Sequence, residues 1–196
     1  MSTSRRDLLR SLGVSALAGP TFRGISLEAA LSTHSRAGAG KAASPLGGYL
    51  PKFFSPHQYE TLQVLCQTII PPSPEDGGAI EAGAPEFIDL LTSENKEFQL
   101  RYGGGIMWLD STCTDRYGQT FLNCSSTERE DILNLIAFRK SAEGDPSLGP
   151  GIDFFSALRK IVADGFFTSE VGIKYLGYIG NTYLKEFPGC PLVPEA

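Results

Sequence analysis

The side chains that most often carry metal or redox chemistry are scarce in this chain. It contains four cysteines and two histidines among 196 residues. Covalent haem attachment needs a Cys-x-x-Cys-His motif, and no cysteine stands in one. Iron–sulfur clusters need closely spaced cysteines, whereas the nearest pair, Cys113 and Cys124, lies eleven positions apart. The sequence therefore predicts neither a haem nor an iron–sulfur cluster bound by this chain.

The histidines and the acidic residues do not form a stronger site. We expect His57 to face solvent in the first turn of a capped helix, and His34 to face solvent in a segment of small residues. Glu81, Glu86 and Asp89 fall within one helical stretch and could hold a cation, but the pattern is more typical of a solvated helix face. We therefore predict no catalytic, cofactor-binding or metal site here.

The glycine-rich stretches do not have the spacing of nucleotide-binding loops. A phosphate loop around residues 36–41 would need glycine at position 35 and Ser or Thr at position 42, which are Ser35 and Ala42. The run at 103–105 lacks the G-x-G-x-x-G pattern that follows a strand, and suggests close backbone packing or a break in a helix. No G-x-S-x-G motif of a serine hydrolase is present.

The four cysteines allow three complete pairings, and the sequence does not choose among them. Cys66 lies on an apolar helix face and is most simply a buried core residue. Cys113 and Cys124 bracket the end of a predicted helix and could meet as a disulfide. Cys190 lies in a proline-flanked segment that cannot be helical, and could bond a cysteine of another chain.

The amino terminus has the pattern of a twin-arginine export signal. Arg5 and Arg6 precede a short, mildly apolar run at residues 12–19, and such signals are read by a receptor, the twin-arginine translocase. An ordinary amphipathic helix is the alternative. Ala16–Ala18 and Ala29–Ala30 are competing cleavage sites. The pattern predicts export of a folded protein to the periplasm, where disulfides are permitted.

The remainder reads as one small helical domain. We divide the chain into a signal segment (1–30), a flexible Gly/Ala/Ser-rich linker (31–51) and a helical domain (52–196). Apolar residues recur at three- and four-residue steps after Ser55 and after Ser125, and a longer helix is expected from about 95 to 117. No alternating strand is evident, so the predicted fold class is mainly α, with long irregular loops.

Composition excludes two further classes. The net charge is −5 and the pI is about 5.1, so no basic face for nucleic acid is expected. No stretch approaches the roughly 18 consecutive apolar residues of a membrane span, so no direct span is expected.

Aromatic residues gather in the last third of the chain. Tyrosine and phenylalanine are enriched at the anchors of protein interfaces, and they also fill cores. Both readings stay open for the cluster as a whole. If it forms an interface, the segment from Gly165 to Pro191 docks on a partner, with these candidate contacts: Phe166, Phe167, Tyr175, Tyr178 and Cys190.

These features together resemble the small third subunit of the gluconate 2-dehydrogenase type of complex. Besides the twin-arginine start, the resemblance rests on short segments at 54–56, 69–71, 83–84, 87–89, 165–169, 177–181 and 187–191. It covers about residues 52 to 191, and the carboxy-terminal segments are its more specific part.

The resemblance implies an accessory role in an oxidoreductase complex. In such complexes an FAD-containing subunit of the glucose–methanol–choline type oxidises a sugar, polyol or sugar acid, and a multihaem cytochrome c subunit takes the electrons. The small subunit binds the flavin subunit, supports its maturation and carries its export signal, while FAD and haem c reside in the partners. Two alternatives stay open: an exported helical binding or assembly module unrelated to any dehydrogenase, and a small enzyme whose site the sequence does not reveal.

Overall fold

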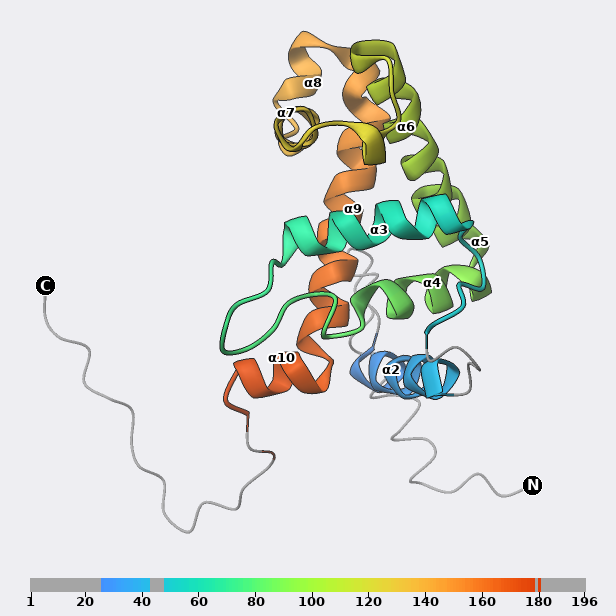
Figure 1. Ribbon diagram of the computed structural model, residues 1–196, viewed down its shortest axis with the longest axis vertical. Coiled ribbons are helices and arrows are strands. Elements are labelled where there is room, and N and C mark those ends of the chain that lie inside the picture. The colour runs from blue at the N-terminus through green and yellow to red at the C-terminus, as the bar shows by residue number, and fades with distance from the viewer. Residues whose placement is uncertain (1–25, 43–47, 179, 181–196) are drawn as a thin grey trace, which may run out of the picture.

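The computed structural model describes residues 26–42, 48–178 and 180, and within these ranges the protein is helical (Figure 1). The described residues contain no β-strand, apart from one isolated bridge between Ser73 and Gly77. The prediction of a mainly α fold with long loops is therefore confirmed. The elements are α2 (Leu27–Ala42), α3 (Pro56–Ile69), α4 (Ala84–Glu94), α5 (Lys96–Phe98), the π-helix η1 (Gln99–Gly103), α6 (Gly104–Tyr117), the 3₁₀-helix η2 (Phe121–Asn123), α7 (Ser126–Ile136), α8 (Ser141–Gly144), the 3₁₀-helix η3 (Pro146–Leu148), α9 (Gly149–Phe167) and α10 (Glu170–Tyr175).

Helix α9 is the central element of the fold. It runs along the long axis of the molecule in Figure 1, and it contacts α2, α3, α4, α6, α7 and α10. Its inward face is a stripe of buried apolar residues that pack with those of α3, α4 and α6. Among the described residues, no helix combines the length and the hydropathy needed to cross a membrane. The core residues that α9 contributes include Phe154, Phe155, Leu158, Ile161 and Val162.

Two helices begin where their capping residues predict. Ser55 Oγ accepts a hydrogen bond from the Gln58 amide, and the Gln58 side chain accepts one from the Ser55 amide, which completes a capping box ahead of α3. Ser125 and Glu128 form the same reciprocal pair ahead of α7. These local bonds satisfy amides that a helix end would otherwise leave without partners, so the sequence alone locates both starts.

The long helix expected from about 95 to 117 is present, with a π-helical segment in its middle. The chain passes from α5 through η1 into α6 without leaving the helical region of backbone angles. The glycine run allows close packing: a methyl group on Gly105 would overlap the ring of Phe154, and one on Gly103 would lie 3.2 Å from the ring of Phe53. The run is a packing surface, and the helix continues through it.

The structure corrects the first part of the predicted flexible linker over residues 31–51. Residues as far as 42 belong to α2, which packs on α4 and α9. Ala30, Thr33 and Ala37 recur at helical spacing and are 1%, 3% and 5% exposed. Small side chains let two helices approach closely, so a composition that is typical of a linker here forms a tightly docked helix. The candidate cleavage site at Ala29–Ala30 lies inside its first turn.

Candidate functional site: an aromatic surface at the end of α9

The carboxy-terminal end of α9 turns back on itself to form α10. Ser169 makes this turn: its hydroxyl donates to the Phe166 carbonyl (2.7 Å) and accepts from the Gly172 amide (3.0 Å). A side chain at position 172 would overlap the backbone of Phe166, so glycine is required for α10 to lie this close to α9. The turn brings aromatic residues from both helices to one end of the molecule.

The predicted interface residues divide into one buried ring and three exposed ones. Phe167, Tyr175 and Tyr178 are 41%, 54% and 55% exposed, whereas Phe166 is only 3% exposed. The Phe166 ring meets Phe167 and Tyr175 edge-on, with ring centroids 5.2 Å and 5.9 Å apart. The expectation that Phe166 presents its own ring to a partner is therefore corrected: it is buried, and it supports the other two from beneath.

A groove borders these aromatic rings, and sequence reasoning did not anticipate it. The groove has a volume of about 400 Å³ and lies between the end of α3, the loop that follows it, and the α9–α10 turn. On the α3 side, the groove is lined by residues that the sequence indicated only as a helix end and a following turn. No local signal could have revealed it, because its two walls are far apart in the sequence. Its lining includes Ile69, Ile70, Pro71, Phe167 and Tyr175. We call this the α3–α10 groove.

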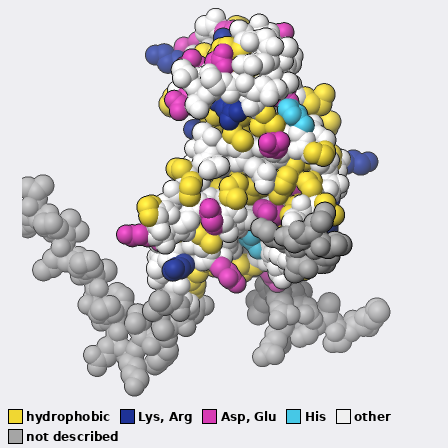
Figure 2. Space-filling model, in the orientation of Figure 1, with side chains coloured by type: hydrophobic (Ala, Val, Ile, Leu, Met, Phe, Trp, Pro, Cys, Tyr) yellow, Lys and Arg dark blue, Asp and Glu magenta, His cyan; other side chains and the backbone are white. Residues whose placement is uncertain are grey.

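Exposed apolar side chains extend beyond the groove. Leu176 adds a 59% exposed side chain next to Tyr175. Figure 2 shows hydrophobic side chains reaching the surface in several places on the lower half of one face, with acidic side chains scattered among them. A separate apolar site lies on η1 and α6, where Leu100 and Met107 are 80% and 65% exposed. Exposed apolar side chains that gather beside a groove are typical of protein-interaction sites.

The other sequence-predicted site residues have different outcomes. Arg5, Arg6 and Cys190 lie outside the described residues. Cys113 and Cys124 are buried, and the Cys113 thiol donates a hydrogen bond to the sulfur of Cys124, whose own thiol points to the Gln119 carbonyl. Burial, followed by the neighbouring Cys124, raises the pKa of Cys113 to about 12, and burial also raises the pKa of Cys124. A disulfide between them stays a prediction.

The solvated acidic face expected at Glu81, Glu86 and Asp89 is not what the structure shows. Glu81 precedes α4, and its carboxylate accepts a hydrogen bond from the Gly78 amide (2.8 Å). Glu86 and Asp89 are 7% and 0% exposed. Among the described residues, no group of three or more His, Cys, Asp or Glu side chains is arranged to hold a metal ion.

Asp89 instead acts as an internal cap for the segment that leads into α3. Its carboxylate accepts from the Tyr49 hydroxyl (2.8 Å) and the amides of Lys52 (2.7 Å), Phe53 (3.1 Å) and Phe54 (3.1 Å). Four donors from one segment satisfy a carboxylate that is fully removed from water. Hydrogen bonds to a charged acceptor are stronger than those between neutral groups. The role of Asp89 is thus structural.

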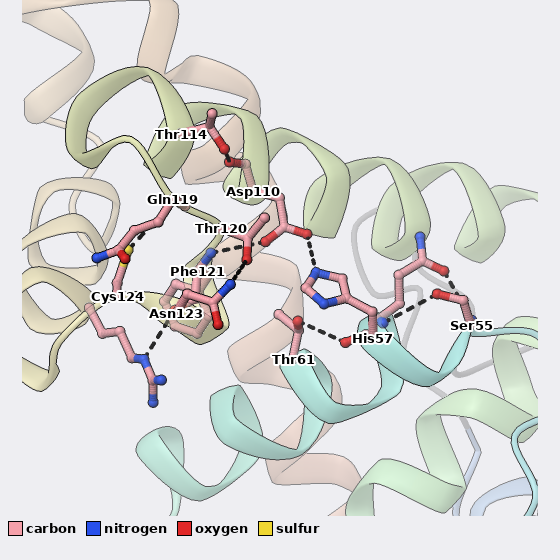
Figure 3. A network of polar contacts seen from close by, with 12 residues as sticks. Ser55, His57, Thr61, Asp110, Thr114, Gln119, Thr120, Phe121, Asn123 and Cys124 are labelled. Atoms are coloured by element: carbon pink, nitrogen blue, oxygen red, sulfur yellow. Dashed lines mark hydrogen bonds and ion pairs between the residues drawn. The ribbon is translucent and has the colours of Figure 1, made fainter.

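His57 is exposed as predicted, but it also makes a specific contact (Figure 3). Its Nε2 lies 2.7 Å from the Asp110 carboxylate on α6, and the other Asp110 oxygen accepts from the Phe121 amide (3.1 Å). Asp110 thereby joins α3, α6 and η2. The partner of the imidazole in this contact is a carboxylate, which orients the ring and does not itself supply an activated nucleophile.

His34 does not face solvent freely, which corrects the expectation for it. Its ring stacks on Phe87 with centroids 4.6 Å apart, and Nε2 lies 3.1 Å from the Thr168 hydroxyl oxygen. Thr168 donates its only hydroxyl proton to the Asp164 carbonyl (2.6 Å), so Nε2 of His34 must be the donor to Thr168. Burial lowers the pKa of His34, against an opposing contribution from the Gly165 carbonyl. The neutral imidazole therefore ties α2 to the end of α9.

The described part of the chain is thus a small helical domain that exposes aromatic and apolar side chains beside a groove, as is common in proteins that bind other proteins. Comparison with known families identifies it further. The chain belongs to the family of gluconate 2-dehydrogenase subunit 3, whose model matches residues 56–189. This confirms the resemblance inferred from the sequence, and it makes the protein a small accessory subunit of a dehydrogenase complex. No curated protein and no solved structure matches the chain.

Proposed function

We propose that the chain is the non-catalytic small subunit of a periplasmic, FAD-dependent dehydrogenase complex of the glucose–methanol–choline type, which oxidises a sugar, polyol or sugar acid. In this proposal the flavin subunit carries FAD, a multihaem cytochrome c subunit carries haem c, and this chain carries no cofactor. The single observation that supports the proposal most is the family match over residues 56–189. The exposed aromatic surface supports it independently, because an accessory subunit needs a surface for its partner.

Co-purification from the native host tests the core of the proposal. A tagged copy of this chain is expected to bring down a yellow, FAD-containing subunit with dye-linked sugar dehydrogenase activity. The chain purified alone is expected to show neither visible absorbance nor turnover. A stoichiometric cofactor retained by the isolated chain would refute the non-catalytic role, and a colourless preparation without a partner would refute the complex.

The contact with the flavin subunit is proposed to centre on the exposed aromatic residues. Tyr175→Ala and Tyr178→Ala are each expected to weaken binding by about 2 kcal/mol or more if the residue is a true anchor. Phe138→Ala is a matched control, because Phe138 is an aromatic residue of similar exposure (67%) between α7 and α8, which lie at the opposite end of the molecule from α10 (Figure 1). Equal losses in all three variants, measured by calorimetry with the purified flavin subunit, would contradict this placement.

Cys190 is proposed to form a disulfide with a cysteine of the partner. In a non-reducing gel the native complex should then show a band at the summed mass that separates on reduction and disappears in Cys190→Ser. Chains that run separately without reductant would make Cys190 an internal partner of another cysteine, and the docking proposal would depend on the aromatic residues alone.

The export signal is proposed to serve both this chain and its flavin partner. Arg5→Lys combined with Arg6→Lys keeps the positive charges, but removes the arginine pair that the translocase reads. We expect dye-linked dehydrogenase activity to disappear from periplasmic extracts of this double variant and to stay in the cytoplasm. Normal periplasmic activity would show that the flavin subunit is exported without this signal.

A further inference from the structure

Three prolines recur at every third position near the carboxy terminus: Pro188, Pro191 and Pro194. The polyproline II helix has three residues per turn, so in that conformation the three rings would line a single edge. Proline fixes its own backbone angle near the polyproline II value, and the residue before a proline is also restricted to extended conformations. The segment therefore has a strong intrinsic preference for this helix and a low entropic cost of adopting it.

The α3–α10 groove has the chemistry that such an edge requires. Aromatic-lined grooves are the usual receptors for proline-rich segments, because the flat rings pack against the pyrrolidine rings. Phe167 and Tyr175 line the groove from the α9–α10 turn with their ring centroids 6.3 Å apart, and Ile69, Ile70 and Pro71 line it from the end of α3 and the loop that follows. The groove volume of about 400 Å³ is large enough for apolar rings, and both aromatic side chains are partly exposed.

The proline segment is attached close to this groove. Tyr175 is both a wall of the groove and the last residue of α10, and the Tyr178 amide donates to the Ile173 carbonyl (3.2 Å), which keeps the chain beside α10. From Gly180, an extended chain reaches about 26 Å by Pro188. A tether of this length gives an attached segment an effective concentration near the millimolar range, so even weak contacts suffice.

We propose that the edge formed by Pro188, Pro191 and Pro194 docks in the α3–α10 groove of its own chain. In a helix of three residues per turn, Cys190 and Val193 lie on a different edge from the prolines, so docking would turn Cys190 outward. The docking deepens the proposed function, and it rests on that function in one respect. An outward Cys190 has a role only if the flavin subunit supplies a cysteine for the proposed disulfide. The surface offered to the flavin subunit would then combine the docked segment with Tyr178, and Tyr175 would support that contact by holding the segment, so that Tyr175→Ala still weakens it.

The test uses the full chain without any partner, by NMR of the ¹⁵N-labelled protein. The triple variant Pro188→Ala, Pro191→Ala, Pro194→Ala removes the proline edge. The matched control Gly189→Ala, Cys190→Ser, Val193→Ala changes only other edges. We expect the amide signals of Phe167 and Tyr175 to shift in the first variant and to change little in the second, while the signal of Met107 on the remote apolar site stays constant in both.

Two outcomes would overturn the proposal. Groove signals that respond equally to both triple variants, or to neither, would show that the proline edge does not dock. Shifts that depend on protein concentration, together with a doubled mass in solution, would show that the segment binds a second copy. Because no flavin subunit is present, failure here would leave the proposed function intact, and failure of the co-purification would leave this docking intact.

Discussion

Replacing Asp89 should destabilise the domain more than any change to an exposed acidic residue. In Asp89→Ala, the amides of Lys52, Phe53 and Phe54 all lose their acceptor, together with the Tyr49 hydroxyl. An unsatisfied buried donor costs about 1–3 kcal/mol. Lys52 is exposed and Phe53 is half-buried, so water can replace part of the loss there, but Phe54 is only 4% exposed. We expect a total loss of about 3–5 kcal/mol, most of it from the buried end of the segment.

The isosteric change Asp89→Asn separates the charge from the shape. The amide oxygen of asparagine can still accept from Phe53 and Phe54, whereas its amino group would face the amide of Lys52, donor against donor. We expect an intermediate loss of about 1–2 kcal/mol, because the bond from Lys52 is lost, the bond with the Tyr49 hydroxyl must reverse its direction, and the two bonds from Phe53 and Phe54 become uncharged. Asp131→Asn on the exposed face of α7 is the control, with an expected change within about 0.5 kcal/mol.

Urea unfolding, followed by circular dichroism and by the fluorescence of the single tryptophan, measures these differences. The midpoints should fall in the order control, Asn variant, Ala variant, with unchanged slopes. A loss below about 1 kcal/mol in Asp89→Ala would refute the reasoning, since it would mean that the three amides find other partners at little cost.

Three shorter predictions concern single contacts. Burial lowers the pKa of His34 in the folded protein, so the unfolded chain takes up a proton first as the pH falls below the ordinary value of 6.5. The free energy of unfolding should therefore be constant just above pH 6.5 as far as His34 is concerned, and should decrease below it. An unchanged pH slope of the unfolding free energy in His34→Gln would contradict this. Gly105→Ala should cost about 1–3 kcal/mol because its methyl group would overlap a phenylalanine ring of α9. Gly104→Ala, which meets no atom within 4 Å, should be neutral or stabilising by up to about 1 kcal/mol, and equal shifts in thermal unfolding would argue against the close packing. Cys113 and Cys124 should form a disulfide in the oxidised protein, and alkylation of both thiols in the unfolded, non-reduced chain would rule it out.

Local signals in the sequence determined the helical character of the domain and several helix ends. Ser55 and Ser125 start their helices through bonds to residues three positions later, and periodic apolar residues mark the buried faces. These features depend on neighbours along the chain, so they can be read without a structure. The family resemblance could be read in the same way, because its motifs are short and contiguous, and the match over residues 56–189 confirms it.

Only the tertiary structure decided which of these residues are buried, and what the surface looks like. Adjacent phenylalanines at 166 and 167 look alike in sequence, yet the fold buries the first and exposes the second. Asp89 has the local pattern of a solvated residue, but the segment leading into α3 folds over it and supplies four donors. Burial is set by contacts between distant segments, and local composition carries no information about those contacts. The same reason explains why α2 could be mistaken for a linker, and why the groove between α3 and α10 came to light only when the chain was folded.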